Sequence, residues 1–144
     1  MNCIIVDDEP LAREAVEMLI NETGELTLAG SFNNATSAAR FIGEHPVDLI
    51  FLDIHMPRLT GLQAFSKFSA KRIPVVMLTG YAEFAYAKEA LKLGALDYLL
   101  KPASLDEVQA TMEKALAICR EREALLKKDY ELEFEKILDL YTTI

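Results

Sequence analysis

Five short apolar runs alternate along this chain of 144 residues with longer segments whose apolar residues recur at helical spacing. The runs at residues 3–6 and 49–52 are uninterrupted, which is typical of strands covered on both faces. Alternation of this kind predicts a doubly wound parallel sheet with helices on both faces, and right-handed crossovers favour the strand order 2-1-3-4-5. We therefore expect an α/β fold with five parallel strands, at residues 3–6, 26–32, 49–52, 74–78 and 96–100.

Helices are predicted between these strands and after the last of them. The first begins at Pro10, a residue favoured in the first helical turn, and carries Leu11, Ala15, Met18 and Leu19 at helical spacing. The next three are expected at residues 34–44, 61–70 and 83–93.

The net charge of −8 argues against a free-standing nucleic-acid binder, which would normally carry a basic face. No apolar run approaches the roughly 20 residues that a membrane helix needs, and residues 1–4 lack the pattern of a signal peptide. We therefore expect a cytoplasmic protein. Cys3 and Cys119 have neither CxxC spacing nor a histidine nearby, so we expect two buried thiols rather than a disulfide or a metal site.

Polar residues follow four of the five predicted strands. Asp7 and Asp8 follow the first, Asp53 the third, Thr79 the fourth and Lys101 the fifth. In doubly wound sheets, function gathers outside the carboxyl ends of the strands, near the point where the strand order reverses. Because strands 1 and 3 are expected to be neighbours, the three aspartates should converge, with Thr79 and Lys101 closing the site.

The chemistry of this set favours phosphoryl transfer. Three carboxylates repel one another unless a cation neutralises them, and Mg²⁺ binds through carboxylates, water and phosphate oxygens. Lys101 would add a positive charge and Thr79 a hydroxyl donor, while a carboxylate can itself be the nucleophile. Taken singly, an Asp after a strand is more often a helix N-cap, Thr79 could be an ordinary turn residue and Lys101 an ordinary surface lysine. The argument for a functional site is that all five residues are expected at the same edge of the sheet.

The chain resembles the receiver domains of two-component response regulators over residues 1 to about 120. The resemblance rests on Val-Asp-Asp-Glu-Pro at 6–10, Leu-Asp-Ile-His-Met-Pro at 52–57, Leu-Thr-Gly-Tyr at 78–81 and Asp-Tyr-Leu-Leu-Lys-Pro at 97–102. Residues 8–13 and 97–102 are most similar to the LytTR (LytR/AlgR-type) group. The fold implied is the flavodoxin-like, three-layer receiver sandwich.

The resemblance also implies roles for individual residues. Asp53 matches the phosphoacceptor, which takes a phosphoryl group from a sensor histidine kinase. Asp7 and Asp8, with Asp53 and the backbone carbonyl of His55, would serve Mg²⁺. Thr79 and Lys101 match the residues that contact the phosphoryl oxygens.

Further features of the family concern the switch and the rim of the site. Tyr98 matches the aromatic residue that turns inward when Thr79 moves toward the phosphoryl group. The bond between Lys101 and Pro102 would be cis. His55 and Tyr81 occupy rim positions that tune the lifetime of the phosphoaspartate.

Two rival functions remain open at this point. An aspartate-nucleophile phosphatase or mutase usually has a second Asp two residues after the nucleophile, where this chain has His55. A flavodoxin-like cofactor binder would have a loop rich in Ser, Thr and Gly after strand 1, whereas this loop is acidic. We therefore expect a signalling domain rather than an enzyme with an external substrate.

The end of the chain favours a long helix. Ser104 is a plausible N-cap with Glu107 as its capping-box partner, and residues 120 to about 140 contain neither Gly nor Pro. Apolar residues recur there without a clean heptad: Leu116, Cys119, Leu126, Tyr130, Phe134, Ile137 and Tyr141. We expect a receiver domain at 1–120 and, at 121–144, a helical extension or linker toward an absent DNA-binding output domain. The extension could promote a homodimer, or fold back as an amphipathic helix.

Overall fold

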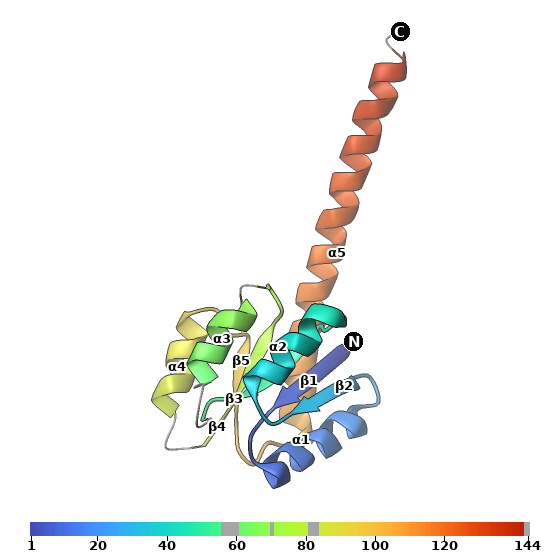
Figure 1. Ribbon diagram of the computed structural model, residues 1–144. Coiled ribbons are helices and arrows are strands. Elements are labelled where there is room, and N and C mark those ends of the chain that lie inside the picture. The colour runs from blue at the N-terminus through green and yellow to red at the C-terminus, as the bar shows by residue number, and fades with distance from the viewer. Residues whose placement is uncertain (56–60, 70, 81–83, 143–144) are drawn as a thin grey trace.

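A five-stranded parallel sheet in the order β2-β1-β3-β4-β5 forms the centre of the molecule, as predicted (Figure 1). The computed structural model describes residues 1–55, 61–69, 71–80 and 84–142. Each strand lies within two residues of its expected position at either end. The strands are β1 (Asn2–Val6), β2 (Thr27–Phe32), β3 (Leu49–Asp53), β4 (Val75–Thr79) and β5 (Asp97–Leu100).

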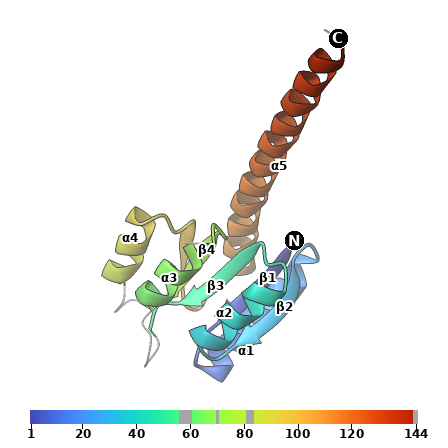
Figure 2. The same ribbon diagram turned by 45° about the horizontal axis from the view of Figure 1, so that its top comes forward.

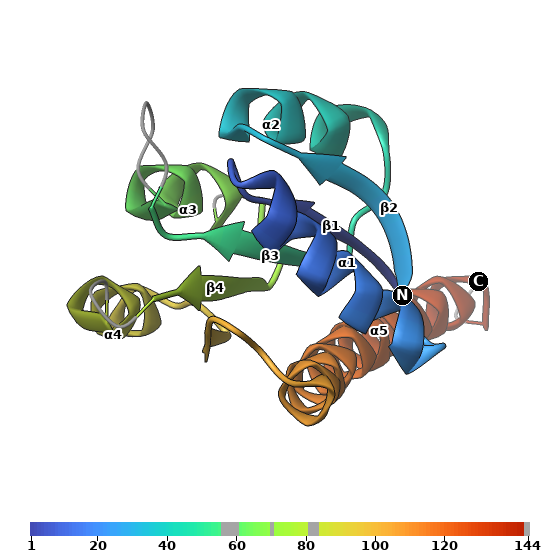
Figure 3. The ribbon, with the colours of Figure 1, turned by 90° about the horizontal axis from the view of Figure 1, so that it is seen from below.

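Helices cover both faces of the sheet, which gives the expected three layers. The alternation of side chains along β1 shows the division: Ile4 and Val6 join the core on one face, and Cys3 and Ile5 join the core on the other. On the first face pack α2 (Ala35–Glu44), α3 (Gly61–Ser69) and α4 (Phe84–Lys92), and on the second pack α1 (Pro10–Thr23) and α5 (Leu105–Thr142). Figure 3 shows α5 running beside α1.

Local sequence signals set several helix ends. The side chain of Asn34 accepts a hydrogen bond of 2.7 Å from the backbone N–H of Ser37 and so caps α2. At the start of α5, the predicted capping box is present: Glu107 N–H donates to Ser104 Oγ, and Ser104 N–H donates to Glu107 Oε1, each at 3.3 Å. Gly24 ends α1 in the left-handed region, at φ 68°.

Burial differs from the sequence pattern in α1 and from the expectation for one of the two thiols. The buried residues of α1 are Val16 and Ile20, whereas Leu11 and Met18, at the spacing that predicted this helix, are 81% and 59% exposed. Apolar residues occur on more than one side of α1, so spacing alone did not identify its inner face. Cys119 is only half-buried, because the body of the domain ends beside it; Cys3 is buried as expected.

Helix α5 extends far beyond the sheet. It runs without interruption for 38 residues, and every residue from 120 to 142 is exposed (Figures 1 and 2). The helix predicted over residues 120 to about 140 is therefore present, while the division into a receiver domain and a linker stays a prediction. Among the described residues, no helix is both long enough and apolar enough to cross a membrane.

Candidate functional site

Four neighbouring strands deliver polar residues to one edge of the sheet. Asp7 follows β1, Asp53 ends β3, Thr79 ends β4 and Lys101 follows β5. The strands pair in parallel, so their carboxyl ends lie along the same edge. The predicted residues are therefore brought together from positions almost 100 residues apart in the chain.

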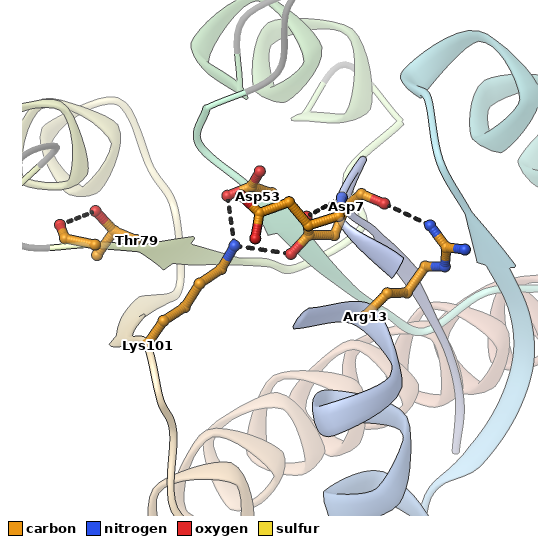
Figure 4. A network of polar contacts seen from close by, with 7 residues as sticks. Asp7, Arg13, Asp53, Thr79 and Lys101 are labelled. Atoms are coloured by element: carbon orange, nitrogen blue, oxygen red, sulfur yellow. Dashed lines mark hydrogen bonds and ion pairs between the residues drawn. The ribbon is translucent and has the colours of Figure 1, made fainter. Parts of the chain in front are cut away.

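Lys101 links two of the aspartates. Its Nζ donates to Asp7 Oδ2 at 2.8 Å and to Asp53 Oδ1 at 3.0 Å (Figure 4). Both aspartates are almost fully buried, and the Lys101 side chain is 26% exposed. The other oxygen of Asp7 accepts a 3.0 Å hydrogen bond from the backbone N–H of Glu9. Asp7 is thus held on both sides, whereas Asp53 keeps one oxygen that does not bond to Lys101.

The electrostatics of the site favour the addition of positive charge. Burial raises the pKa of Asp53 to about 6, and the negative charge of Asp7 acts in the same direction. Lys101 and a hydrogen bond from the backbone of His55 favour the ionised carboxylate but only partly offset these effects. Burial favours the neutral form of Lys101, yet hydrogen bonding and attraction to Asp7 and Asp53 outweigh it and raise its pKa. Lys101 is therefore a fixed cation among carboxylates that outnumber it.

A metal ion could be held by three of these side chains. Asp7, Asp8 and Asp53 each offer a carboxylate oxygen, and these oxygens lie within 4.8 Å of one another. Asp8 is half-exposed, so solvent reaches the cluster from its side. Hard cations such as Mg²⁺ and Ca²⁺ prefer ligands of this kind, and Mg²⁺ commonly uses only one or two carboxylates and completes its shell with water and phosphate.

Thr79 lies at the edge but does not contact the carboxylates. Its side chain is buried, and its hydroxyl donates a 3.0 Å hydrogen bond to the backbone carbonyl of the next residue, Gly80, on the side away from Asp53 (Figure 4). Tyr98, on β5, is half-buried, and its ring meets the ring of Phe84 edge-on, with centroids 5.5 Å apart. The aromatic pair joins β5 to the start of α4.

Sequence reasoning missed one residue that supports the site. The Arg13 guanidinium donates a 2.8 Å hydrogen bond to the backbone carbonyl of Asp7 and so ties α1 to the acidic loop (Figure 4). A basic residue in the first turn of a helix is unusual, because it opposes the helix dipole, and that signal could have pointed to a specific role. The bond between Lys101 and Pro102 is cis, as expected. Tyr81, and Met56 and Pro57 of the quoted motif, lie outside the described residues.

Comparison with known proteins identifies the family. Residues 3–113 match the model of the response regulator receiver domain. The chain is 38% identical over 130 residues to the transcriptional regulatory protein BtsR of Escherichia coli, covering 90% of this chain and 51% of BtsR. It is 33% identical over 136 residues to the transcriptional regulatory protein YdfI of Bacillus subtilis, covering 93% of this chain and 64% of YdfI.

Solved structures agree with this assignment. The response regulatory domain of MrkE from Klebsiella pneumoniae superposes with a TM-score of 0.72 at 32% identity, covering 84% of this chain and 99% of that domain. The chain spans about half the length of several of the curated relatives it matches, BtsR among them. The family match covers the sheet and all of the polar edge described above. The chain therefore belongs to the response regulator receiver domains, the signalling domains of two-component systems.

Proposed function

We propose that Asp53 is the phosphoacceptor of this receiver domain and takes its phosphoryl group from a sensor histidine kinase. The observation that carries the proposal is the placement of Asp53, a buried carboxylate between Asp7 and the fixed cation Lys101 at the centre of the polar edge. Both oxygens of Asp7 accept hydrogen bonds from Lys101 or Glu9, whereas one Asp53 oxygen does not bond to Lys101. An Asp53 oxygen would attack the phosphorus of the kinase phosphohistidine. The P–N bond then breaks, its electron pair returns to the imidazole, and an acyl phosphate remains on Asp53.

Lys101 supplies part of the charge stabilisation, and the carboxylates around it would hold the cation that supplies the rest. Lys101 lies 3.0 Å from one Asp53 oxygen, where its ammonium group can bind a phosphoryl oxygen. Asp7 and Asp8, together with the carbonyl of His55, would hold Mg²⁺ beside the acceptor. When bound, Mg²⁺ supplies the positive charge that neutralises the carboxylates and the incoming phosphoryl oxygens.

Thr79 and Tyr98 would convert phosphorylation into a change of surface. In the structure the Thr79 hydroxyl bonds to the adjacent Gly80 carbonyl and is not committed to a distant partner. A phosphoryl group on Asp53 offers it stronger acceptors, and its movement would free space into which Tyr98 can turn from its contact with Phe84. The face formed by α4, β5 and the first part of α5 would then differ between the two states.

The output of this switch is proposed from the relatives. BtsR and YdfI are named transcriptional regulatory proteins, and this chain matches only part of each of them. We therefore propose control of a DNA-binding output domain outside residues 1–144, reached through the extension at 121–144. Homodimer formation on phosphorylation would follow from a change on the α4–β5–α5 face.

Transfer of label from a phosphorylated histidine kinase tests the acceptor directly. Wild-type protein with Mg²⁺ should gain one acid-stable, base-labile phosphoryl group. Asp53→Asn should gain none, because an amide is not an effective nucleophile. Glu89→Gln, which neutralises an exposed carboxylate on α4, is the matched control and should label normally. Label retained by folded Asp53→Asn would move the acceptor elsewhere, and rapid turnover of many phosphoesters would favour a phosphatase.

A further inference from the structure

The loop between β1 and α1 carries two of the proposed metal ligands, and the two are held differently. Asp7 is fixed through its side chain, because Oδ2 accepts from Lys101 and Oδ1 accepts from the backbone N–H of Glu9. Its backbone N–H also donates to the carbonyl of Phe32 at 3.0 Å. The Asp8 side chain is half-exposed and makes no hydrogen bond or ion pair with any residue that the structure describes. The position of the Asp8 carboxylate therefore depends on the backbone on either side of it.

Arg13 binds the backbone on both sides of Asp8. Its guanidinium donates a 2.8 Å hydrogen bond to the carbonyl of Asp7, and its own backbone N–H donates at 3.0 Å to the carbonyl of Glu9. Together with the bond from Glu9 N–H to Asp7 Oδ1, these bonds enclose Asp8. Of the three, the guanidinium bond is the one made by a side chain outside the segment 7–9. A substitution of Arg13 would therefore remove this bond and leave the groups that form the other two in place.

The positive charge of Arg13 does not account for its position. Within the described ranges of the chain, no carboxylate forms an ion pair with Arg13. Its place near the start of α1 opposes the helix dipole. Arg13 also lies on the side of Asp7 away from Asp53 (Figure 4), where a positive charge disfavours a cation bound at the acidic cluster. Its contribution to the site is therefore geometric: a hydrogen bond from a charged donor, which is stronger than a neutral one, fixes the direction of the Asp7 carbonyl.

We propose that Arg13 is a positioning residue of the metal site, and that it favours Mg²⁺ over larger divalent cations by fixing the backbone that carries Asp8. The inference rests on the proposed function, because it takes Asp7, Asp8 and Asp53 as metal ligands. Mg²⁺ requires nearly octahedral geometry with ligands at about 2.0–2.1 Å, whereas Ca²⁺ accepts oxygens at about 2.3–2.6 Å in flexible arrangements. A fixed Asp8 carboxylate therefore matters more for Mg²⁺ than for Ca²⁺.

The hydrogen bond and the charge of Arg13 have opposite effects on metal affinity. Loss of the bond frees the Asp7 carbonyl and the backbone of Asp8. Because groups that orient metal ligands typically contribute about 10- to 100-fold to affinity, Mg²⁺ binding should weaken by roughly 10-fold or more, and Ca²⁺ binding by less. Loss of the charge alone would tighten the binding of both divalent ions by similar factors. The ratio of the two dissociation constants therefore measures positioning separately from charge.

The first test is calorimetric titration with MgCl₂ and, separately, with CaCl₂ at constant ionic strength. Arg13→Met keeps an unbranched, helix-favouring side chain but has neither the charge nor the donors, and it should lose the preference for Mg²⁺ by roughly 10-fold relative to wild type. Arg13→Lys keeps the charge and a donor and should retain most of the preference. The matched control is Arg40→Met, which removes the same charge from the exposed side of α2 and should bind both ions normally. Partial unfolding lowers the number of binding sites and not this ratio, so a loss of stability cannot imitate the result.

The second test is amide hydrogen exchange in the metal-free protein, followed by NMR. The Glu9 N–H, which donates to Asp7 Oδ1, should exchange roughly 10-fold faster in Arg13→Met, because a hydrogen bond from a charged group no longer holds the loop. The same amide should be unchanged in Arg40→Met. Amides within β3, which report opening of the sheet, should be unchanged in both variants.

The possible outcomes distinguish this inference from the proposed function. An unchanged Mg²⁺ to Ca²⁺ preference in Arg13→Met, or tighter binding of both ions, would overturn the positioning role of Arg13 and leave Asp53 as the acceptor. Unchanged exchange of the Glu9 amide would also overturn it. A wild type that binds neither ion and accepts no phosphoryl group would instead refute the proposed metal site and acceptor, and the role of Arg13 with them.

Discussion

Replacing Asp53 with asparagine should stabilise the metal-free protein above neutral pH. The buried carboxylate has its pKa raised from an ordinary 3.8 to about 6 by burial and by the charge of Asp7. Folding therefore disfavours the ionised form, and asparagine removes that charge while keeping the shape of the side chain. The shift of about two pKa units corresponds to about 3 kcal/mol, at 1.36 kcal/mol per unit, which is the largest gain expected.

The pH dependence of this gain follows from the sign of the shift. Because the pKa of Asp53 is higher in the folded protein, the folded state binds more protons than the unfolded state between about pH 4 and pH 6. Wild-type stability contributed by this group is therefore present at low pH and is lost as pH rises through 6. The difference between Asp53→Asn and wild type should be small near pH 4, grow up to pH 6 and reach its full size by about pH 7.5.

Urea denaturation in EDTA at pH 4 to 8 measures this difference. Glu89→Gln is the control, since neutralising an exposed carboxylate should change stability by no more than about 0.5 kcal/mol. A saturating divalent cation should reduce the advantage of Asp53→Asn, because binding to the wild-type site stabilises only the folded protein that retains its ligands. If Asp53→Asn were no more stable than wild type at pH 8 in EDTA, the conclusion that burial and Asp7 disfavour the ionised form of Asp53 would be wrong.

Two further predictions concern metal binding and the switch. Asp8→Ala should weaken Mg²⁺ binding by roughly 100-fold or more, since loss of even an outer-shell partner of a metal ligand typically lowers metal affinity by about 10- to 100-fold. Calorimetric titration would measure the affinity. The control is Glu9→Ala, which changes an exposed neighbour outside the acidic cluster and should bind Mg²⁺ normally. Thr79→Ala should accept a phosphoryl group yet show no phosphorylation-dependent change in the environment of Tyr98, read by tyrosine fluorescence or NMR, whereas Thr79→Ser, which keeps the hydroxyl, should retain that change. A Thr79→Ala protein that responds like wild type would exclude Thr79 as the switch.

The residues at the polar edge of the sheet were predictable because they depend on the order of strands and helices along the chain. Uninterrupted apolar runs such as residues 49–52 identify central strands, and parallel strands must place the residues that follow them at one edge. That is why Asp7, Asp53 and Lys101 could be grouped from the sequence, and the structure brings them within hydrogen-bond distance. Their roles in phosphorylation remain predictions.

Features that depend on three-dimensional packing were less predictable. The inner face of α1 does not follow from the spacing of its apolar residues, because Leu11 and Met18 are apolar but exposed and the pattern does not distinguish them from Val16 and Ile20. The position of Arg13 in the first turn of α1 could have suggested a role, but its partner, the Asp7 carbonyl, depends on how α1 docks against β1. The exposure of residues 120–142 likewise depends on packing, because this part of α5 extends beyond the sheet.

The short connection between Lys101, which follows β5, and the start of α5 allows the long helix to act as a lever. Lys101 lies only four residues before Leu105, the first residue of α5, and the first turns of the helix pack on the sheet through Val108 and Met112. Beyond residue 120 the helix is a stiff arm of about 34 Å, so each degree of tilt at its base displaces its far end by about 0.6 Å. A small repacking under α5 near the polar edge is thereby magnified at the far end of the helix.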